Sequence, residues 1–154
     1  MTDAPRYRST FAGPARPIAG LFDWLGRFPL SVIQLAMRIG VGGVFFKSGL
    51  TKIASWDTTL LLFAEEYKVP VLPNELAASL ATAAELTCPV MLVVGLLARF
   101  GAAALLAMTF VIQFFVYPEN WVEHLLWASV LGYILTRGAG ALSLDALIGR
   151  RFRA

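Results

Sequence analysis

Cysteine and histidine are almost absent from this sequence, which has one residue of each, Cys88 and His124. A single thiol cannot form an internal disulfide, a Cys-x-x-Cys redox pair or a structural zinc site. One histidine without a cluster of neighbouring cysteines or carboxylates is also a poor metal ligand set. The sequence therefore predicts no metal site and no thiol chemistry of its own, and it favours Cys88 as a small packing residue.

Charged residues are scarce as well. They make up 15% of the 154 residues, whereas hydrophobic residues make up 58%, and the mean hydropathy is +0.69. Soluble domains have about a quarter of their residues charged, and a chain this short has little interior in which to bury so many apolar side chains. We therefore expect lipid to be the solvent of a single domain.

The net charge of +3 and the isoelectric point of about 9.4 do not indicate nucleic-acid binding. The basic residues lie in the tails and between apolar runs, without interleaved aromatic residues. This arrangement is typical of loops that face anionic lipid headgroups. The expected partner is therefore the bilayer, and nucleic acid is excluded.

Four apolar runs predict helices that cross a membrane, at residues 29–50, 77–98, 100–117 and 121–136. A helix rises about 1.5 Å per residue and must cross a hydrocarbon core about 30 Å thick. The fourth run is short, and we expect it to borrow residues at either end or to lie where the bilayer is thin. The predicted fold class is an all-α integral membrane four-helix bundle formed by residues 29–150.

The two ends of the chain lie outside this predicted membrane domain. Residues 1–28 are expected to form a mobile or interfacial tail, in which Ile18, Leu21 and Phe22 have the spacing of a helix on the headgroups. The tail does not resemble a cleavable signal peptide, because its arginines are dispersed among prolines and the first apolar run is too long. Residues 151–154 form a basic C-terminal end.

The basic residues also predict the orientation of the spans. Nine arginines would share the side of the two termini: Arg6, Arg8, Arg16, Arg27, Arg99, Arg137, Arg150, Arg151 and Arg153. The two loops on the other side would hold Lys52 and Lys68. The positive-inside bias therefore places both termini in the cytoplasm.

The longest connection between spans, residues 56–74, predicts a short amphipathic helix on the outer surface. Trp56-Asp57-Thr58-Thr59 is typical of a helix N-cap, and apolar residues 60–63 precede the charged segment that contains Glu65 and Tyr67. We expect Trp56, Asp57, Glu65 and Tyr67 to form a contact surface for a partner. The sequence leaves open whether the segment is a plain connector or a lid over an opening.

Several polar residues fall within or at the edges of the predicted spans. We take them as a candidate ligand-binding site or polar core: Arg38, Lys47, Lys52, Glu85, Gln113 and His124. Ionisable side chains at membrane depth are costly, so they usually face the interior of a bundle and are paired.

Helical spacing predicts how these residues are arranged. Arg38 and Lys52 fall on one face of the first span, and Lys47 lies about 180° from Arg38, where it can reach the membrane boundary. Counting along the helices places Arg38 about 13 Å and Glu85 about 20 Å from the cytoplasmic side. The count predicts an Arg38–Glu85 interaction with Gln113 nearby. It leaves open whether this is a clamp between helices or a ligand site.

Small residues four positions apart, such as Ala36 and Gly40, favour close approach of helix backbones in lipid.

His124 lies one turn inside the outer end of the fourth span, beside Glu123 and Trp121. It is either a histidine of the interfacial aromatic belt or a ligand contact at the outer opening of the bundle, facing Lys47 or Lys52.

Several segments carry a family resemblance: Arg38-Ile39-Gly40, Gly49-Leu50-Thr51-Lys52, Glu85, Gly95-Leu96-Leu97-Ala98-Arg99 and Leu142-Ser143-Leu144-Asp145. On these segments the chain resembles the DoxX family of small four-helix membrane proteins, over residues 29–150. The run of residues 45–60 is similar, more narrowly, to a subgroup encoded beside bufferin-type metal-binding peptide systems.

The resemblance implies a multi-pass protein of the bacterial inner (cytoplasmic) membrane and leaves two functions open. The first is a non-catalytic accessory of a redox or metal-stress pathway, of the copper type, with protein partners from that pathway. The second is a quinone- or isoprenoid-binding subunit of an oxidoreductase, with quinone as its cofactor. Whether the chain forms a homo-oligomer is also left open.

Overall fold

The structure is a computed structural model that describes residues 16–70 and 72–151. In that part of the chain all regular structure is helical and there is no strand, so the predicted all-α class is confirmed. The chain divides into two compact units, residues 1–30 and 31–154.

The first unit contains helix α1, Arg16–Gly26. Its apolar side chains Leu21, Phe22 and Trp24 are exposed. The helix expected from the spacing of Ile18, Leu21 and Phe22 is present, and its place on the headgroups stays a prediction. The rest of the predicted tail, residues 1–15, lies outside the described residues, as do residues 152–154 of the basic end.

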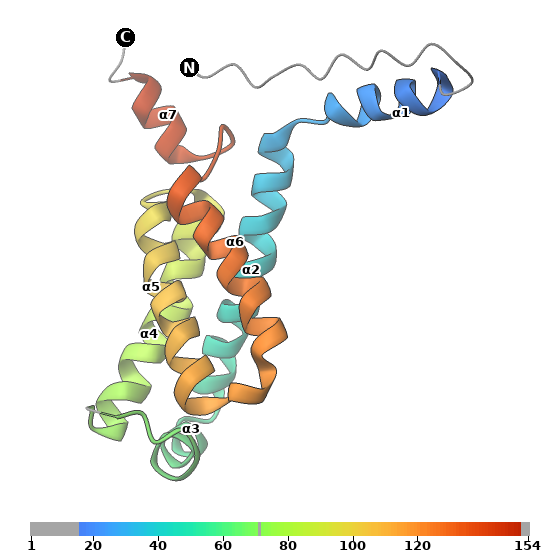
Figure 1. Cartoon of the computed structure of the whole chain (residues 1–154). Helices are drawn as coiled ribbons and strands as arrows, with labels where there is room; N and C mark the ends of the chain where they lie inside the picture. Colours follow the sequence, from blue (N-terminus) through green and yellow to red (C-terminus); the bar gives the residue numbers. More distant parts are fainter. Residues whose placement is uncertain (1–15, 71, 152–154) are drawn as a thin grey trace. The chain divides into compact units, whose positions relative to one another are not determined.

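The second unit is a bundle of long helices that run alongside one another (Figure 1). They are α2 (Leu30–Ala54), α4 (Asn74–Val94), α5 (Ala98–Val111) and α6 (Trp121–Arg137). A π-helical turn, η2 (Ile112–Val116), continues α5, and a 3-10 turn, η3 (Pro118–Asn120), leads into α6.

Short helices lie at the two ends of this bundle (Figure 1). Helix α3 (Trp56–Leu62) and the π-helical turn η1 (Phe63–Tyr67) form the short helical segment that the sequence predicted after the first span, here named the outer segment, and its side of the membrane stays a prediction. Helix α7 (Leu144–Arg151) lies at the opposite end of the bundle. The predicted N-cap was wrong in detail. Ser55 occupies the cap position of α3, and no side chain makes a capping hydrogen bond there.

Three helical segments are long and apolar enough to span a membrane: Leu30–Ala54, Asn74–Val94 and Ala98–Val116. Helix α6 has 17 residues, or about 26 Å at 1.5 Å per residue, slightly less than the hydrocarbon core. The bundle therefore has three or four candidate membrane-spanning helices. As expected, the fourth is the short one.

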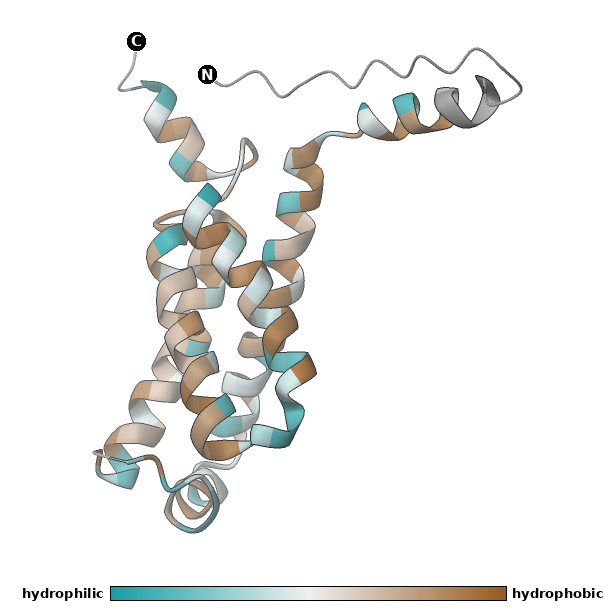
Figure 2. Cartoon of the chain, in the orientation of Figure 1, coloured by the Kyte–Doolittle hydropathy of each residue, from teal (hydrophilic) through white to brown (hydrophobic). Residues whose placement is uncertain are grey.

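The bundle is apolar outside and partly polar inside. Large apolar side chains such as Phe100, Phe110 and Leu126 are exposed, and Figure 2 shows hydrophobic colour along the long helices. Arg38 and Glu85, in contrast, are buried. An exposed apolar surface this large needs a covering, and burial of charged groups among apolar spans is typical of membrane bundles. Lipid is the solvent of the outer surface.

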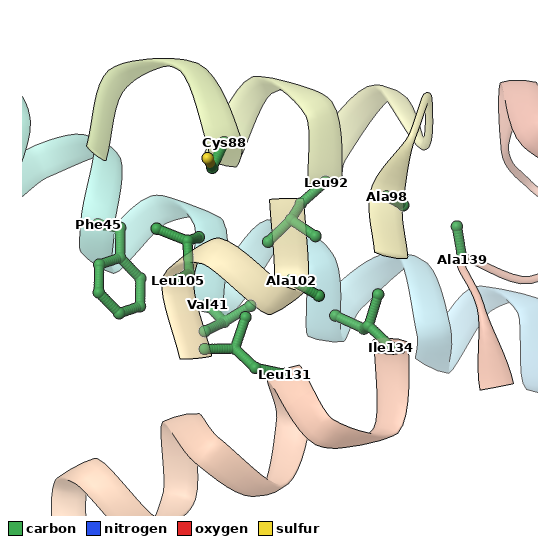
Figure 3. Close-up of a cluster of buried hydrophobic side chains, with 10 residues drawn as sticks. All are labelled: Val41, Phe45, Cys88, Leu92, Ala98, Ala102, Leu105, Leu131, Ile134 and Ala139. Atoms are coloured by element: carbon green, nitrogen blue, oxygen red, sulfur yellow. The ribbon is translucent and has the colours of Figure 1, made fainter. Parts of the chain in front are cut away.

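The core of the bundle joins all four long helices (Figure 3). It contains Val41, Phe45, Cys88, Leu92, Ala98, Ala102, Leu105, Leu131, Ile134 and Ala139. Small residues bring the backbones together: a Cβ atom added at Gly101 would lie 3.2 Å from the carbonyl oxygen of Cys88. Cys88 is a buried free thiol in this core, which agrees with its predicted packing role.

Gly49 lies where α2 packs tightly against α4. A Cβ atom at Gly49 would lie 2.9 Å from side-chain atoms of Leu86 and 3.1 Å from the Cβ of Glu85. A Cβ atom at Gly40 would have no neighbour within 4 Å, and Ala36 is exposed. The prediction of close helix packing at Ala36 and Gly40 was therefore wrong, because these residues do not lie on the face that meets α4.

We expect Gly49→Ala to lower the free energy of unfolding by about 1 to 3 kcal/mol, because the added methyl group overpacks the contact with α4. Gly40→Ala is the matched control on the same helix. It should be neutral or stabilising by up to about 1 kcal/mol, because alanine favours helix and nothing obstructs it. Thermal melts of the two purified variants in detergent measure the difference, and equal melting temperatures would contradict the prediction.

Candidate functional site

A cavity of about 530 Å³ lies at the end of the bundle that carries α3. Side chains from α2, α4, α5, α6 and the outer segment line it. Most of its surface is apolar, and the apolar lining includes Val44, Phe45, Leu80, Ala84, Met108 and Ile112. Pockets for small organic molecules are about 300 to 1,000 Å³ and mainly apolar, with a few polar groups. This cavity has that character.

The main polar group of the cavity is an ion pair between Lys52 and Glu85. Lys52 Nζ lies 2.8 Å from Glu85 Oε1 and 2.7 Å from Oε2, and the two side chains are 14% and 4% exposed. Lys52 also donates to Ser48 Oγ at 2.8 Å, and Ser48 donates to Glu85 Oε1 at 3.2 Å. Ser48 and Lys52 meet because they lie one helical turn apart on α2.

The predicted Arg38–Glu85 interaction was wrong. Glu85 did find a cationic partner, but the partner is Lys52. The residue count assumed that the helices end at the same level. In the structure Arg38, eight residues into α2, lies beside the last turn of α4. Glu85 lies beside Gly49, eleven residues or about 16 Å further along α2, which is beyond the reach of the arginine.

Arg38 instead binds backbone carbonyl groups at the opposite end of the bundle from α3. It is fully buried. Its Nη1 donates to the carbonyls of Leu92 at 3.0 Å and Val93 at 3.1 Å, and its Nη2 donates to the carbonyl of Leu142. The last carbonyls of a helix lack partners within the helix and carry partial negative charge. Arg38 therefore stabilises the end of α4 and does not contribute to the cavity.

Asp145 completes this end of the bundle. Its carboxylate accepts hydrogen bonds from the backbone N–H groups of Leu97 at 2.9 Å and Ala98 at 3.0 Å. Its own N–H donates to the carbonyl of Gly95 at 2.8 Å. A carboxylate at a helix N-terminus satisfies free N–H groups and opposes the helix dipole. Asp145 thus caps α5 from the segment that begins α7, and the sequence analysis did not include it among the site residues.

We expect Asp145→Ala to lower the free energy of unfolding by about 1 to 2 kcal/mol, because it removes both hydrogen bonds to the start of α5. Asp145→Asn keeps one acceptor oxygen and should lose less than half as much. Hydrogen exchange at Leu97 and Ala98 should increase in the alanine variant. Unchanged exchange at these two amides would contradict the assignment of Asp145 as the cap.

The second polar group of the cavity is His124, which is 4% exposed. Its Nδ1 lies 2.7 Å from Gln113 Oε1, and Gln113 Nε2 donates to the carbonyl of Pro118 at 2.9 Å. Gln113 was expected near Glu85, but its hydrogen bonds are with His124 and Pro118. His124 and Lys52 line the same cavity, and a ligand contact of His124 there stays a prediction.

An aromatic wall lies next to His124. The ring of Trp127 contacts His124 with centroids 5.2 Å apart and Phe45 with centroids 5.4 Å apart. All three side chains line the cavity. Edge and tilted contacts of this kind hold rings in fixed orientations. The wall offers a flat ligand an aromatic surface beside a polar nitrogen.

The outer segment is attached to the end of α5 by a hydrogen bond. Tyr117, which follows the third span, donates from its hydroxyl to Glu66 Oε1 at 2.6 Å. This hydrogen bond, together with partial burial, raises the pKa of Tyr117. The ring of Tyr67 contacts Tyr117 with centroids 5.8 Å apart. Tyr67 belongs to η1 and Tyr117 follows η2, and π-helical turns are frequent at functional sites.

The four predicted partner-contact residues separate into two groups. Trp56 is half-buried and packs against the small cluster of Phe63, Ala77 and Ala78, and Tyr67 lines the cavity. Asp57 and Glu65 are exposed. The outer segment therefore has an inner face that contributes to the cavity wall and an exposed, acidic outer face.

The remaining predicted site residue, Lys47, is exposed on α2 and does not line the cavity. Its position agrees with the prediction that it lies away from Arg38.

Three site residues that the sequence analysis missed are Ser48, Tyr117 and Trp127. Ser48 could have been found from its place one turn before Lys52, whereas the aromatic residues had no signal that separates them from lipid-facing rings.

No group of three or more metal-ligating side chains occurs in residues 16–70 and 72–151. The described residues bring together a mainly apolar cavity whose buried polar groups include the Lys52–Glu85 ion pair and His124. Arg38 and Asp145 secure the other end of the bundle. The fold and the site thus define a class, the multi-pass membrane helix bundles with an amphiphilic cavity at one end.

The chain belongs to the DoxX family, whose model matches residues 33–118, more than half of the sequence. It is also similar to an uncharacterized protein of Haemophilus influenzae, with 28% identity over 129 residues that cover 76% of this chain and 83% of that protein. No solved structure matches. The predicted family is confirmed.

Proposed function

We propose that the cavity holds the headgroup of an isoprenoid quinone or a similar isoprenoid lipid, and that the protein is a quinone-binding membrane subunit of an oxidoreductase. The observation that supports this function best is the cavity of about 530 Å³, lined by apolar and aromatic side chains. Two separate polar groups, the Lys52–Glu85 pair and His124, stand on its wall. A ligand with a polar aromatic head and an apolar tail matches both kinds of surface.

The chain offers little for redox chemistry on its own. It has one cysteine and one histidine, and the cysteine is buried in the core and does not line the cavity. We therefore propose that a partner protein transfers the electrons and that this chain positions the lipid. The basic residues of the sequence favour an inner membrane location with both termini in the cytoplasm and the cavity in the outer half.

The test is to purify the protein in mild detergent and to measure extracted lipids by mass spectrometry. Wild type should carry close to one quinone or other isoprenoid per chain. Ala81→Leu should lose most of it, because Ala81 lines the cavity and the larger side chain fills the space. Ala83→Leu is the matched control, since Ala83 is exposed on the same helix. Wild type without isoprenoid, or Ala81→Leu with a full complement, would contradict the function.

A second function is favoured by the outer face of α3 and η1. Asp57 and Glu65 are exposed there, and Asp57 lies within the run of residues 45–60 that is similar to the bufferin-associated subgroup. We propose in this case a non-catalytic accessory of a redox or metal-stress pathway, whose acidic face contacts a protein partner. Cells that lack the gene should then tolerate copper excess poorly.

Complementation separates this second function from the first. The double variant Asp57→Lys/Glu65→Lys should fail to restore copper tolerance, whereas Arg150→Gln on α7, at the other end of the bundle, should restore it. Full tolerance without the gene would contradict the second function. Bound isoprenoid, quantified by the same lipid extraction, would be unaffected by either variant.

A further inference from the structure

The amide of Gln113 has only one orientation that satisfies its neighbours. The carbonyl of Pro118 can only accept a hydrogen bond, so the amide nitrogen of Gln113 must be the atom that faces it at 2.9 Å. The amide oxygen is then the atom 2.7 Å from His124 Nδ1. An oxygen accepts, and therefore His124 carries its proton on Nδ1.

This orientation determines what His124 presents to the cavity. A neutral imidazole with a proton on Nδ1 has a free lone pair on Nε2. Nε2 has no hydrogen-bond partner among residues 16–70 and 72–151. Among the described residues, the side-chain nitrogen that is both fully buried and without a partner is Arg38 Nε. His124 Nε2 is therefore not fully buried. His124 lines the cavity and is 4% exposed, so an acceptor nitrogen is left for a ligand.

The Lys52–Glu85 pair is likewise an acceptor. The three N–H groups of Lys52 all have partners, at Ser48 Oγ and at both oxygens of Glu85. The Ser48 hydroxyl donates to Glu85 Oε1. A carboxylate oxygen has two lone pairs, and Oε2 accepts one hydrogen bond in the described chain, from Lys52. Glu85 Oε2 can therefore accept another, whereas Lys52 has no proton left to donate.

Both of these polar groups thus require hydrogen-bond donors on the ligand. Tyr67, Tyr117, Asn120 and Glu123 also line the cavity. The phenols and the amide both donate and accept, so they do not discriminate between ligands, and the carboxylate of Glu123 is a further acceptor. A quinone head has two carbonyl oxygens, which only accept. Its reduced form, a quinol, has two hydroxyl groups that donate. Buried acceptors left without a donor are costly.

We infer that the cavity selects the reduced, quinol form of an aromatic headgroup, with hydroxyl groups that donate to His124 Nε2 and Glu85 Oε2. The inference rests on the proposed isoprenoid-binding function and specifies the ligand of the same site. Ser48 and Gln113 act as positioning residues. Ser48 accepts a hydrogen bond from one N–H group of Lys52, and Gln113 accepts the hydrogen bond that keeps the histidine proton on Nδ1.

The experiment compares two probes on the full-length protein in detergent, decylubiquinol and decylubiquinone, by calorimetric titration under argon. We expect the quinol to bind at least about tenfold more tightly than the quinone, which corresponds to about 1.4 kcal/mol. His124→Phe keeps an aromatic ring but removes the acceptor, and it should reduce the preference to about threefold or less, mainly by weakening quinol binding.

The outcomes distinguish this inference from the function on which it rests. Equal binding of both probes, or tighter binding of the quinone, would overturn the preference for quinol and leave the isoprenoid site standing. Binding of neither probe would overturn the proposed function itself. The comparison of the two probes on wild type decides the matter even if His124→Phe does not fold, and a wild-type preference that His124→Phe retains in full would exclude His124 as its source.

Discussion

Lys52→Met should lower the free energy of unfolding by about 3 to 5 kcal/mol, the usual consequence of removing one member of a buried ion pair. Glu85 is 4% exposed and accepts hydrogen bonds at both oxygens from Lys52. Without the lysine its carboxylate keeps only the longer hydrogen bond from Ser48, at 3.2 Å. Unfolding in a series of detergent mixtures, followed by circular dichroism, measures the loss.

Two controls make this expectation specific to the pair. Lys47→Met removes an exposed lysine from the same helix and should change stability by no more than about 0.5 kcal/mol. The double variant Lys52→Met/Glu85→Leu removes both charges and should recover most of the loss, because an apolar pair of similar volume avoids the desolvation of two ions. If Lys52→Met and Lys47→Met were equally stable, the ion pair would not stabilise the bundle.

Arg38→Met should destabilise the bundle by about 3 kcal/mol, since hydrogen bonds to a charged group contribute about 1.5 to 3 kcal/mol each and part of that is offset by removing a buried charge. The side chain is fully buried and donates to the carbonyls of Leu92, Val93 and Leu142. Arg38→Lys should recover less than half, because one ammonium nitrogen cannot span carbonyl groups of two segments as the guanidinium does.

The effect of Arg38→Met should be localised at one end of the bundle. Hydrogen exchange should rise at residues 95–98, where α4 ends and α5 begins, and ligand binding in the distant cavity should change little. Arg99→Met is the control: Arg99 is exposed, its contact with the carbonyl of Thr136 is long at 3.4 Å, and its loss should be within about 0.5 kcal/mol. If Arg38→Met changed the free energy of ligand binding more than the free energy of unfolding, Arg38 would be part of the ligand site.

Much of the site was accessible from the sequence, although its pairing was not. Lys52, Glu85 and His124 were selected because ionisable groups among apolar residues are costly and usually face the interior, and all three line the cavity. Arg38 and Lys47 were selected for the same reason and lie elsewhere. The free-energy cost of burying a charge indicates that a charged residue needs a partner, but it does not identify the partner.

The amino-acid sequence by itself determined the helical membrane class, the short helix between the first two spans and the burial of Glu85. These depend on local composition and on the period of one helix, both of which can be counted along the chain. The tertiary structure alone decided that Lys52 is the partner of Glu85, that Arg38 binds the end of α4, and that Asp145 caps α5. Each of these depends on how far one helix is shifted along another. That shift is set by side-chain packing at contacts such as Gly49 against Leu86, between residues distant in the chain.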